Sequence, residues 1–252
     1  MSKLILVSND DGVLSKGIRT LARFLKNIPH ARVVVVAPDR EKSAASHSLT
    51  LHRPIRYERI AKDVYSVEGT PTDCVVVAVH EILKRKPDVV VSGINRGGNL
   101  GEDVHYSGTV SAAMEGVIAG IPGVAISLVT ANGRKPVYTA GAKFAVKLVK
   151  QVLNQGLPHG VVLNVNVPNV LERELKGVEI VKLGKRNYGS LIVEKLDPKK
   201  RKYYWITGDD SGFENIPHSD CNAILAKKIS ITPIYVDMTH HEMIETMKQW
   251  KL

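Results

Sequence analysis

Apolar residues occur along the chain in two patterns that alternate. Short continuous runs, such as residues 4–7 and the valines at 33–36, are typical of strands buried on both faces of a parallel sheet. Between such runs lie segments whose apolar residues recur every three or four positions, as over 18–25, which predicts amphipathic helices. The alternation predicts an α/β fold with a mostly parallel sheet covered on both faces.

The same patterns locate the individual elements. Strands are expected at 4–8, 32–37, 89–95, 124–128, 161–167 and 229–234, and further extended segments at 55–57, 64–67, 178–183, 191–196 and 202–206. Helices are expected at 18–25, 71–86, 109–119, 137–152 and 219–227, with an amphipathic tail at 240–250.

The segments at 191–196 and 202–206 predict a hairpin with a basic turn and the aromatic residues Tyr203, Tyr204 and Trp205 on one arm. Two strands alone are marginally stable, so we expect this hairpin to pack on another subunit. The basic turn resembles a nucleic-acid patch, but a solvated turn explains it better. We treat 1–252 as one domain, with a catalytic core at 1–170 and a hairpin and oligomerisation segment at 171–252.

The first strand leads directly into Asn9, Asp10, Asp11 and Gly12. In open α/β sheets, ligands bind beyond the carboxyl ends of the strands, where these residues would lie. Adjacent carboxylates repel one another, and a hard divalent cation with oxygen ligands would relieve the repulsion. A solvated Asp-Asp-Gly turn accounts for this dipeptide about as well.

The loop after the second strand, at 39–48, brings Ser43, Ser46 and Ser48 to the same edge of the sheet. Hydroxyl groups placed there could join a site built around the aspartates. A serine-rich surface loop is the alternative interpretation.

A glycine-rich loop at 93–108 contains Asn95 and Asn99 and ends at Ser107. Ser107, Gly108 and Thr109 then precede or open a helix, where backbone donors and the helix dipole favour an anion such as phosphate. The loop matches neither the Walker A sequence nor the dinucleotide fingerprint. Capping by Thr109 is the simpler alternative, but the glycine-rich loop favours an anion site.

Composition narrows the functional classes. The chain has 252 residues, 44% hydrophobic and 24% charged, as is ordinary for a globular protein. Its net charge of +10 suits anionic ligands, although a lysine-rich surface is the commoner cause, and we expect no stable nucleic-acid partner. The sequence contains no apolar run of membrane-spanning length and no signal peptide, so we expect a cytoplasmic protein. Cys74 and Cys221 lack metal-type or redox-type spacing and are expected to be buried or idle thiols.

Five motifs occur in order along the chain. They are Ser-Asn-Asp-Asp-Gly at 8–12, Ala-Pro-Asp-Arg at 37–40 followed by Ser-Ala-Ala-Ser at 43–46, Gly-Thr-Pro-Thr-Asp at 69–73, Ser-Gly-Ile-Asn at 92–95 and Tyr-Ser-Gly-Thr at 106–109. Together they resemble the SurE family of survival-protein nucleotidases, and the likeness continues to 230–233. The resemblance implies a Rossmann-like three-layer α/β/α core and a metal-dependent phosphatase acting on nucleoside 5′- or 3′-monophosphates. It also implies polyphosphate trimming in some members, and a C-terminal hairpin exchanged between subunits in dimers or tetramers.

The resemblance also implies roles for particular residues. One Mg²⁺ or Mn²⁺ per subunit would be held by Asp10, Asp11, Ser43 and Asn95. The phosphate-side and catalytic groups would be Asn9, Asn99, Ser107, Gly108 and Thr109, beside Asp10, Asp11 and Asn95. The family commonly has glycine at the position of Ala44 and asparagine at that of His47, so His47 could face the substrate.

These residues support a hypothesis in which the cation polarises a phosphoryl oxygen and activates a water. The sequence assigns no lysine or arginine as a charge clamp. One rival is an aspartyl-phosphate route like that of haloacid-dehalogenase phosphatases, whose two aspartates stand two residues apart instead of adjacent. The other is a nucleotide-sensing or RNA-binding module with a structural aspartate pair.

Overall fold

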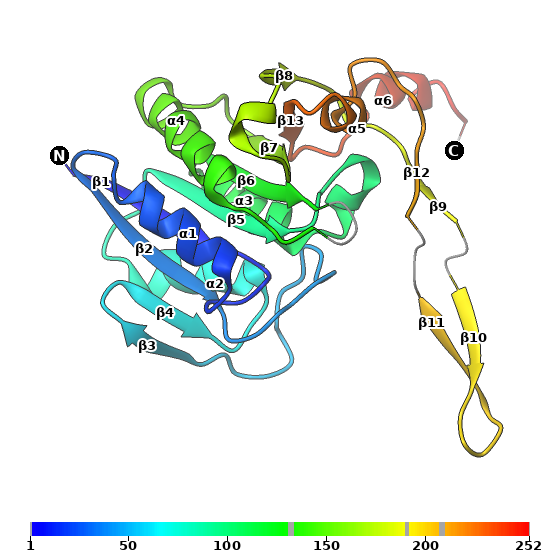
Figure 1. Cartoon of the computed structure of the whole chain (residues 1–252), viewed down its shortest axis with the longest axis horizontal. Coiled ribbons are helices and arrows are strands. Elements are labelled where there is room, and N and C mark those ends of the chain that lie inside the picture. The colour runs from blue at the N-terminus through cyan, green and yellow to red at the C-terminus, as the bar shows by residue number, and fades with distance from the viewer. Residues whose placement is uncertain (1, 131–133, 190–191, 207–209, 252) are drawn as a thin grey trace.

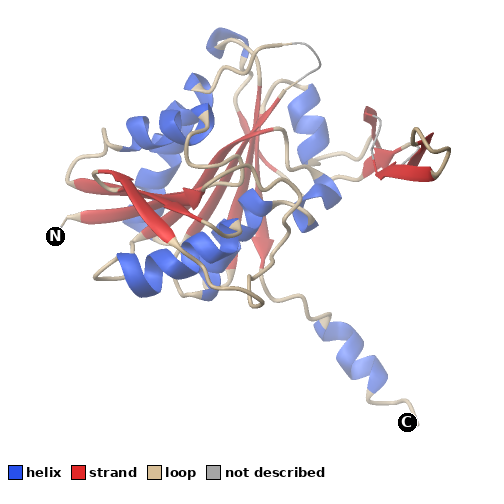
Figure 2. Cartoon of the chain, turned by 90° about the horizontal axis from the view of Figure 1, so that it is seen from below, coloured by secondary structure: helices blue, strands red, loops and turns tan. Residues whose placement is uncertain are grey.

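A nine-stranded sheet with helices on both sides forms the centre of the computed structural model, which describes residues 2–130, 134–189, 192–206 and 210–251 (Figures 1 and 2). The strand order is β3-β4-β2-β1-β5-β6-β7-β13-β8. The ladders are parallel except for β3 with β4 and β13 with β7. The predicted α/β/α architecture is therefore confirmed.

The element bounds follow the predicted alternation closely. The strands of the central sheet are β1 (Lys3–Ser8), β2 (Ala31–Pro38), β3 (Tyr57–Ala61), β4 (Val64–Val67), β5 (Val89–Arg96), β6 (Gly123–Val129), β7 (Val161–Pro168), β8 (Val178–Ile180) and β13 (Ile229–Tyr235). The α-helices are α1 (Lys16–Leu25), α2 (Pro71–Val77), α3 (Gly108–Ile118), α4 (Thr139–Gln155), α5 (Asp220–Leu225) and α6 (His241–Met247). Shorter helical turns are η1 (Ala78–Ile82), η2 (Gly101–His105) and η3 (Glu172–Glu174).

The two faces of β1 show why a continuous apolar run suits a central strand. Ile5 and Val7 pack in the cluster that includes buried residues of α1 and α4. Leu4 and Leu6 point the other way, into the cluster formed with α2 and α3. Because successive side chains of a strand point to opposite faces, a strand covered on both sides needs apolar residues at every position.

The chain order places the end of β1 at a switch point in the sheet. After β1 the chain forms β2 on one side, and it later returns to form β5 on the other side of β1. Loops leaving β1 and β5 therefore diverge over opposite faces of the sheet, which is where open α/β sheets bind ligands.

Several predicted elements had wrong bounds; the extended segment expected at 178–183, for example, is a strand only over Val178–Ile180. The helix expected over 71–86 is regular only to Val77, continues as the wider turn η1, and ends before the extended residue Leu83. Leu83 turns into the apolar cluster of α2, and Pro87 disfavours helical backbone in the residue before it. The arm expected at 55–57 is β3, because a tight turn pairs Ala61 with Val64.

The predicted C-terminal hairpin is confirmed as β10 (Ile192–Leu196) paired with β11 (Lys202–Ile206); Leu191 lies outside the described residues. Two further strands, β9 (Arg186–Tyr188) and β12 (Asp210–Phe213), pair at its base, and the hairpin extends away from the sheet (Figure 1). Trp205 and Ile206 are 62% and 86% exposed. The helix α6 also lies beyond the main body in Figure 2.

Cys74 and Cys221 are free and buried, as predicted. Among the residues that the structure describes, no helix combines the length and apolar character needed to cross a bilayer.

Candidate functional site

Asp10 lies just beyond β1 and is tied to the start of α3. The Thr109 amide donates to its Oδ2 at 3.1 Å, and the Thr109 hydroxyl donates to its Oδ1 at 2.5 Å. Burial raises the pKa of Asp10, whereas the bonds from Thr109 act to lower it. Two segments 99 residues apart in sequence, both predicted for the site, are thus in direct contact.

Asp11 points toward the end of β5, where the backbone amide of Arg96 donates to its Oδ2 at 3.0 Å. Burial and the negative charge of Asp10 raise the pKa of Asp11 to about 6. The two carboxylates therefore repel each other in a partly desolvated place, and a bound cation would favour the ionised form of both.

Asn9 is fully buried at the base of the same turn. Its Nδ2 donates to the carbonyl of Gly12 at 3.0 Å and to the Ser15 hydroxyl at 2.9 Å. Its Oδ1 is also buried and has no hydrogen-bond partner among the described residues. A buried oxygen without a donor is costly, so this atom is available to a ligand or an ordered water.

The glycine-rich loop holds its two asparagines differently. The Asn95 Nδ2 donates to the Gly97 carbonyl at 3.0 Å, within the same turn that approaches Asp11. The Asn99 Nδ2 instead donates to the Ser127 hydroxyl on β6 at 2.6 Å. Asn99 therefore anchors the loop to the sheet. Asn95 is the neighbour of Arg96, whose amide binds Asp11.

Ser107, and not Thr109, caps α3. The amide of Val110 donates to the Ser107 hydroxyl oxygen at 3.0 Å. The capping alternative for Thr109 is therefore wrong, because its hydroxyl is used by Asp10. Gly108 lies between them, packed against Asp10.

The loop at 39–48 is bound to this site at two points. The Lys42 amide donates to the Asp10 carbonyl at 2.7 Å, and the Ser46 hydroxyl donates to the His105 carbonyl at 2.6 Å. Ser43 itself is exposed and donates to Glu41 at 2.6 Å. The structure thus brings Ser43 to the predicted edge, with its hydroxyl turned toward Glu41. His47 lies 2.8 Å from the Glu115 carboxylate on α3.

Ala44 has a φ of +56°, in the left-handed region that favours glycine. We expect Ala44→Gly to raise the free energy of unfolding by roughly 0.5–1 kcal/mol, because relief of this strain exceeds glycine's extra entropy in the unfolded chain. Chemical denaturation would measure it. The neighbouring Ala45→Gly, at a position without positive φ, is the matched control and should be neutral or destabilising. A less stable Ala44→Gly protein would contradict the prediction.

Sequence reasoning missed three residues at the site. Glu41 adds negative charge that raises the pKa of both Asp10 and Asp11, and the charge of Arg96 acts in the opposite direction on Asp11. Tyr138 is partly buried, and Asp11 contributes to raising its pKa. Glu41 and Arg96 each directly follow one of the five motifs, and this adjacency could have identified them as site residues. Nothing in the sequence around Tyr138 indicates a place at the site.

The oxygen atoms of the predicted ligands are of the kind that a hard divalent cation prefers. Within the described ranges, no group of three or more Asp, Glu, His and Cys side chains is arranged to hold a metal. The two aspartates would therefore need neutral oxygens to complete a coordination shell, as amide and hydroxyl groups provide. Such a cation would relieve the mutual repulsion of the two aspartates.

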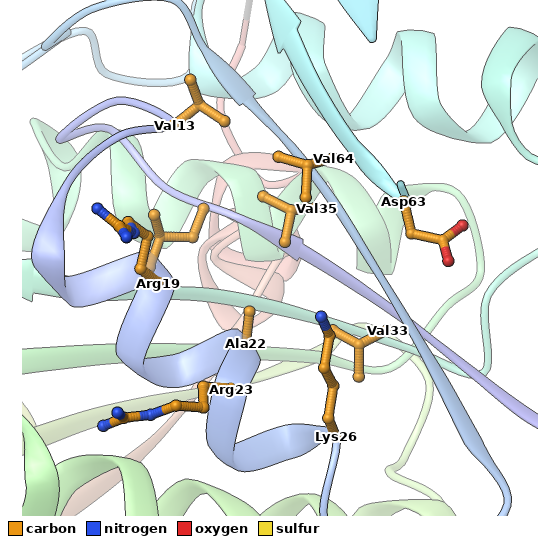
Figure 3. A pocket seen from close by; sticks show the side chains of 10 residues that line it. Val13, Arg19, Ala22, Arg23, Lys26, Val33, Val35, Asp63 and Val64 are labelled. Atoms are coloured by element: carbon orange, nitrogen blue, oxygen red, sulfur yellow. The ribbon is translucent and has the colours of Figure 1, made fainter. Parts of the chain in front are cut away.

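A cavity of about 220 Å³ lies elsewhere, between α1 and the strands β2 and β4. Valines form its floor, and Arg19, Arg23, Lys26 and Asp63 surround it (Figure 3). None of the predicted site residues lines it.

The sequence and the fold of this chain are similar to those of known proteins. The sequence model described as "Survival protein SurE" matches residues 5–190. Proteins named 5′-nucleotidase SurE from Geobacter sulfurreducens and Geotalea uraniireducens are 49% and 50% identical; each alignment covers 98% of this chain, and 94% and 99% of those proteins respectively. The crystal structure of SurE protein from Aquifex aeolicus superimposes with a TM-score of 0.86 at 42% identity, covering 97% of this chain and 98% of that one. With the motifs converging on one edge of a matching fold, this chain belongs to the SurE family.

Proposed function

We propose that this chain hydrolyses nucleoside 5′-monophosphates to nucleoside and phosphate, using a divalent cation, Mg²⁺ or Mn²⁺. Its relatives named 5′-nucleotidase SurE share about half of its residues over nearly the whole chain, and it is a phosphoric monoester hydrolase. One observation carries the proposal: the Asp10 carboxylate lies against the N-terminus of α3 and the adjacent Asp11 carboxylate lies at the end of β5, so that candidate cation ligands are next to candidate phosphate donors.

Asp10, Asp11, Ser43 and Asn95 are the residues proposed to hold the cation. When bound, it would polarise a phosphoryl oxygen and lower the pKa of a water molecule, so that hydroxide is available as the nucleophile near neutral pH. Carboxylate oxygens accept more than one interaction, so the bonds from Thr109 orient Asp10 without excluding a cation.

The start of α3 offers specific donors for the phosphoryl group. The amides of Thr109 and Val110 already donate to Asp10 and to Ser107. The Gly108 amide has no partner in the described part of the chain, and the Ser107 hydroxyl still has its proton to donate. We propose that these two groups donate hydrogen bonds to a phosphoryl oxygen of the substrate. Donors already held in place stabilise the negative charge that develops on this oxygen in the transition state.

A substrate panel tests the proposal. Purified protein would be assayed for phosphate release from purine and pyrimidine 5′- and 3′-monophosphates, ATP and polyphosphate, each with Mg²⁺ or Mn²⁺. We expect release from the 5′-monophosphates; the 3′-monophosphate and polyphosphate arms define how far the activity extends. No release from any monophosphate would contradict the proposal, and metal-independent RNA binding that falls steeply with salt would support the binding-module alternative.

We also propose that the hairpin of β10 and β11 packs on a second copy of the chain, in a dimer or tetramer. Its support is the exposed apolar surface of Trp205, Ile206 and their neighbours on a two-stranded arm.

Trp205→Glu is therefore expected to shift the protein toward a smaller assembly, because a charge would be buried in the contact. Light scattering after size-exclusion chromatography would measure the mass. Lys199→Gln in the turn changes net charge by the same amount and should leave assembly intact. An unchanged mass for Trp205→Glu would exclude this surface as the contact.

A further inference from the structure

The short helix η2 lies within the glycine-rich loop at 93–108, shortly before α3, and it contacts both sides of the candidate site. Its last carbonyl, on His105, accepts the Ser46 hydroxyl at 2.6 Å, and the next carbonyl, on Tyr106, accepts the Ser46 amide at 3.1 Å. Ser107, the cap of α3, follows immediately. The position of η2 therefore determines the positions of both the loop at 39–48 and the start of α3.

A five-residue 3₁₀-helix has few hydrogen bonds of its own, so it depends on its neighbours for a fixed position. The first neighbour is Asp220, at the start of α5, which is fully buried. Its Oδ2 accepts the Gly101 amide, the first of η2, at 3.0 Å. Its Oδ1 accepts the amides of Gly184 at 2.7 Å and Cys221 at 2.8 Å. One carboxylate thus joins η2 to the segment that leads into β9.

The second neighbour is β9, which contacts the two acidic residues of η2. The Tyr188 hydroxyl donates to Asp103 at 2.5 Å, and the Arg186 amide donates to Glu102 at 2.9 Å. The Arg186 guanidinium also lies 3.4 Å from Asp103. Burial and the adjacent Asp103 raise the pKa of Tyr188, so its hydroxyl keeps the proton that it donates.

We infer that Asp220 and Tyr188 are positioning residues of the phosphatase site, which they reach only through η2; this inference rests on the proposed function. Neither contacts the candidate metal or phosphate groups in the described structure. Both belong to 171–252, the segment that also carries the hairpin. The site is therefore fully ordered only when that segment is docked on η2.

The test uses the full-length protein with two substitutions of minimal size, Tyr188→Phe and Asp220→Asn. Steady-state kinetics with a 5′-monophosphate and amide hydrogen exchange over 101–109 would be measured on each. We expect faster exchange in this segment, unchanged exchange in β2, a KM raised roughly 10-fold, and a kcat/KM lowered about 10- to 100-fold, as for other supporting residues of metal sites. A smaller folded fraction would lower kcat and leave KM in place, so the KM separates positioning from instability.

Tyr57→Phe is the matched control, because it removes the same hydroxyl from the edge strand β3, where the described structure shows no hydrogen-bond partner for it. It should behave like the unmodified protein. Unchanged exchange and KM in Tyr188→Phe would overturn the inference even if Asp220→Asn fails to fold. Faster exchange with an unchanged KM would also overturn it, since η2 would then move without affecting the site. If the unmodified protein releases no phosphate, the proposed function fails, and the exchange data alone decide whether these residues hold η2.

Discussion

Removing divalent cations with a chelator is expected to lower phosphate release at least ~10³-fold, and adding Mg²⁺ or Mn²⁺ is expected to restore it. A Lewis acid at a phosphoryl group is worth several kcal/mol, and about 4 kcal/mol corresponds to this factor. The protein itself supplies mostly negative charge here, from Asp10, Asp11 and Glu41, which would repel a phosphate without a cation. Full activity in chelator, with no metal detectable in the protein, would contradict the prediction.

A substitution tests whether the Asp10 carboxylate is needed for metal-dependent phosphate release. Asp10→Asn should reproduce the loss and raise the metal concentration needed for half-maximal activity. The side chain keeps its size, but one of the two Thr109 donors loses its acceptor. Asp63→Asn is the matched control, because Asp63 pairs with Arg32 near the start of β2, at the opposite end of the sheet. Its activity should be unchanged.

Gly108→Ala is expected to lower kcat at least ~10²-fold in a protein that still folds. A Cβ at this position would lie 2.9 Å from the Asp10 Cβ and 2.9 Å from the Pro71 Cγ. Neither atom is the end of a flexible chain, so the methyl group would push Asp10 and the start of α3 apart. Displacement of a reacting group by about 1 Å costs on the order of 10²-fold in rate.

Gly141→Ala is the matched control for this substitution. Gly141 also lies near the start of a helix, α4, but its Cβ would meet atoms only at 3.5–3.9 Å. Activity should stay the same and stability should rise by up to ~1 kcal/mol, as alanine is the better helix former. Thermal unfolding and kinetics on both variants separate a local displacement from a general loss of structure. Full activity of Gly108→Ala would show that the close packing against Asp10 is not needed.

The sequence predicted the elements well because apolar periodicity reports burial directly. The run in β1 and the three-to-four spacing in α1 needed no tertiary information, and the carboxyl ends of parallel strands necessarily meet at one edge. The sequence alone therefore predicts that Asp10, Asn95 and Thr109 lie in the same region.

Contacts that depend on exact geometry could not be predicted in this way. The Thr109 hydroxyl binds Asp10, leaving the cap of α3 to Ser107, and nothing in the local sequence distinguishes these two arrangements. Ser43 faces Glu41, a rotamer choice that a motif does not specify. The strand β13 was predicted, but its antiparallel place beside β7 was not, because a buried strand looks alike whichever neighbour it joins.

That placement of β13 has a consequence for how the chain is made. Ser230 pairs with Asn166, so β7 leaves the ribosome before its partner strand β13 has been made. Until then, β7 presents an open backbone edge, the kind of surface on which unfinished chains pair with one another and aggregate. A chain whose synthesis stops within the hairpin would contain all the predicted metal ligands and yet keep the unpaired edge of β7, so we expect it to aggregate.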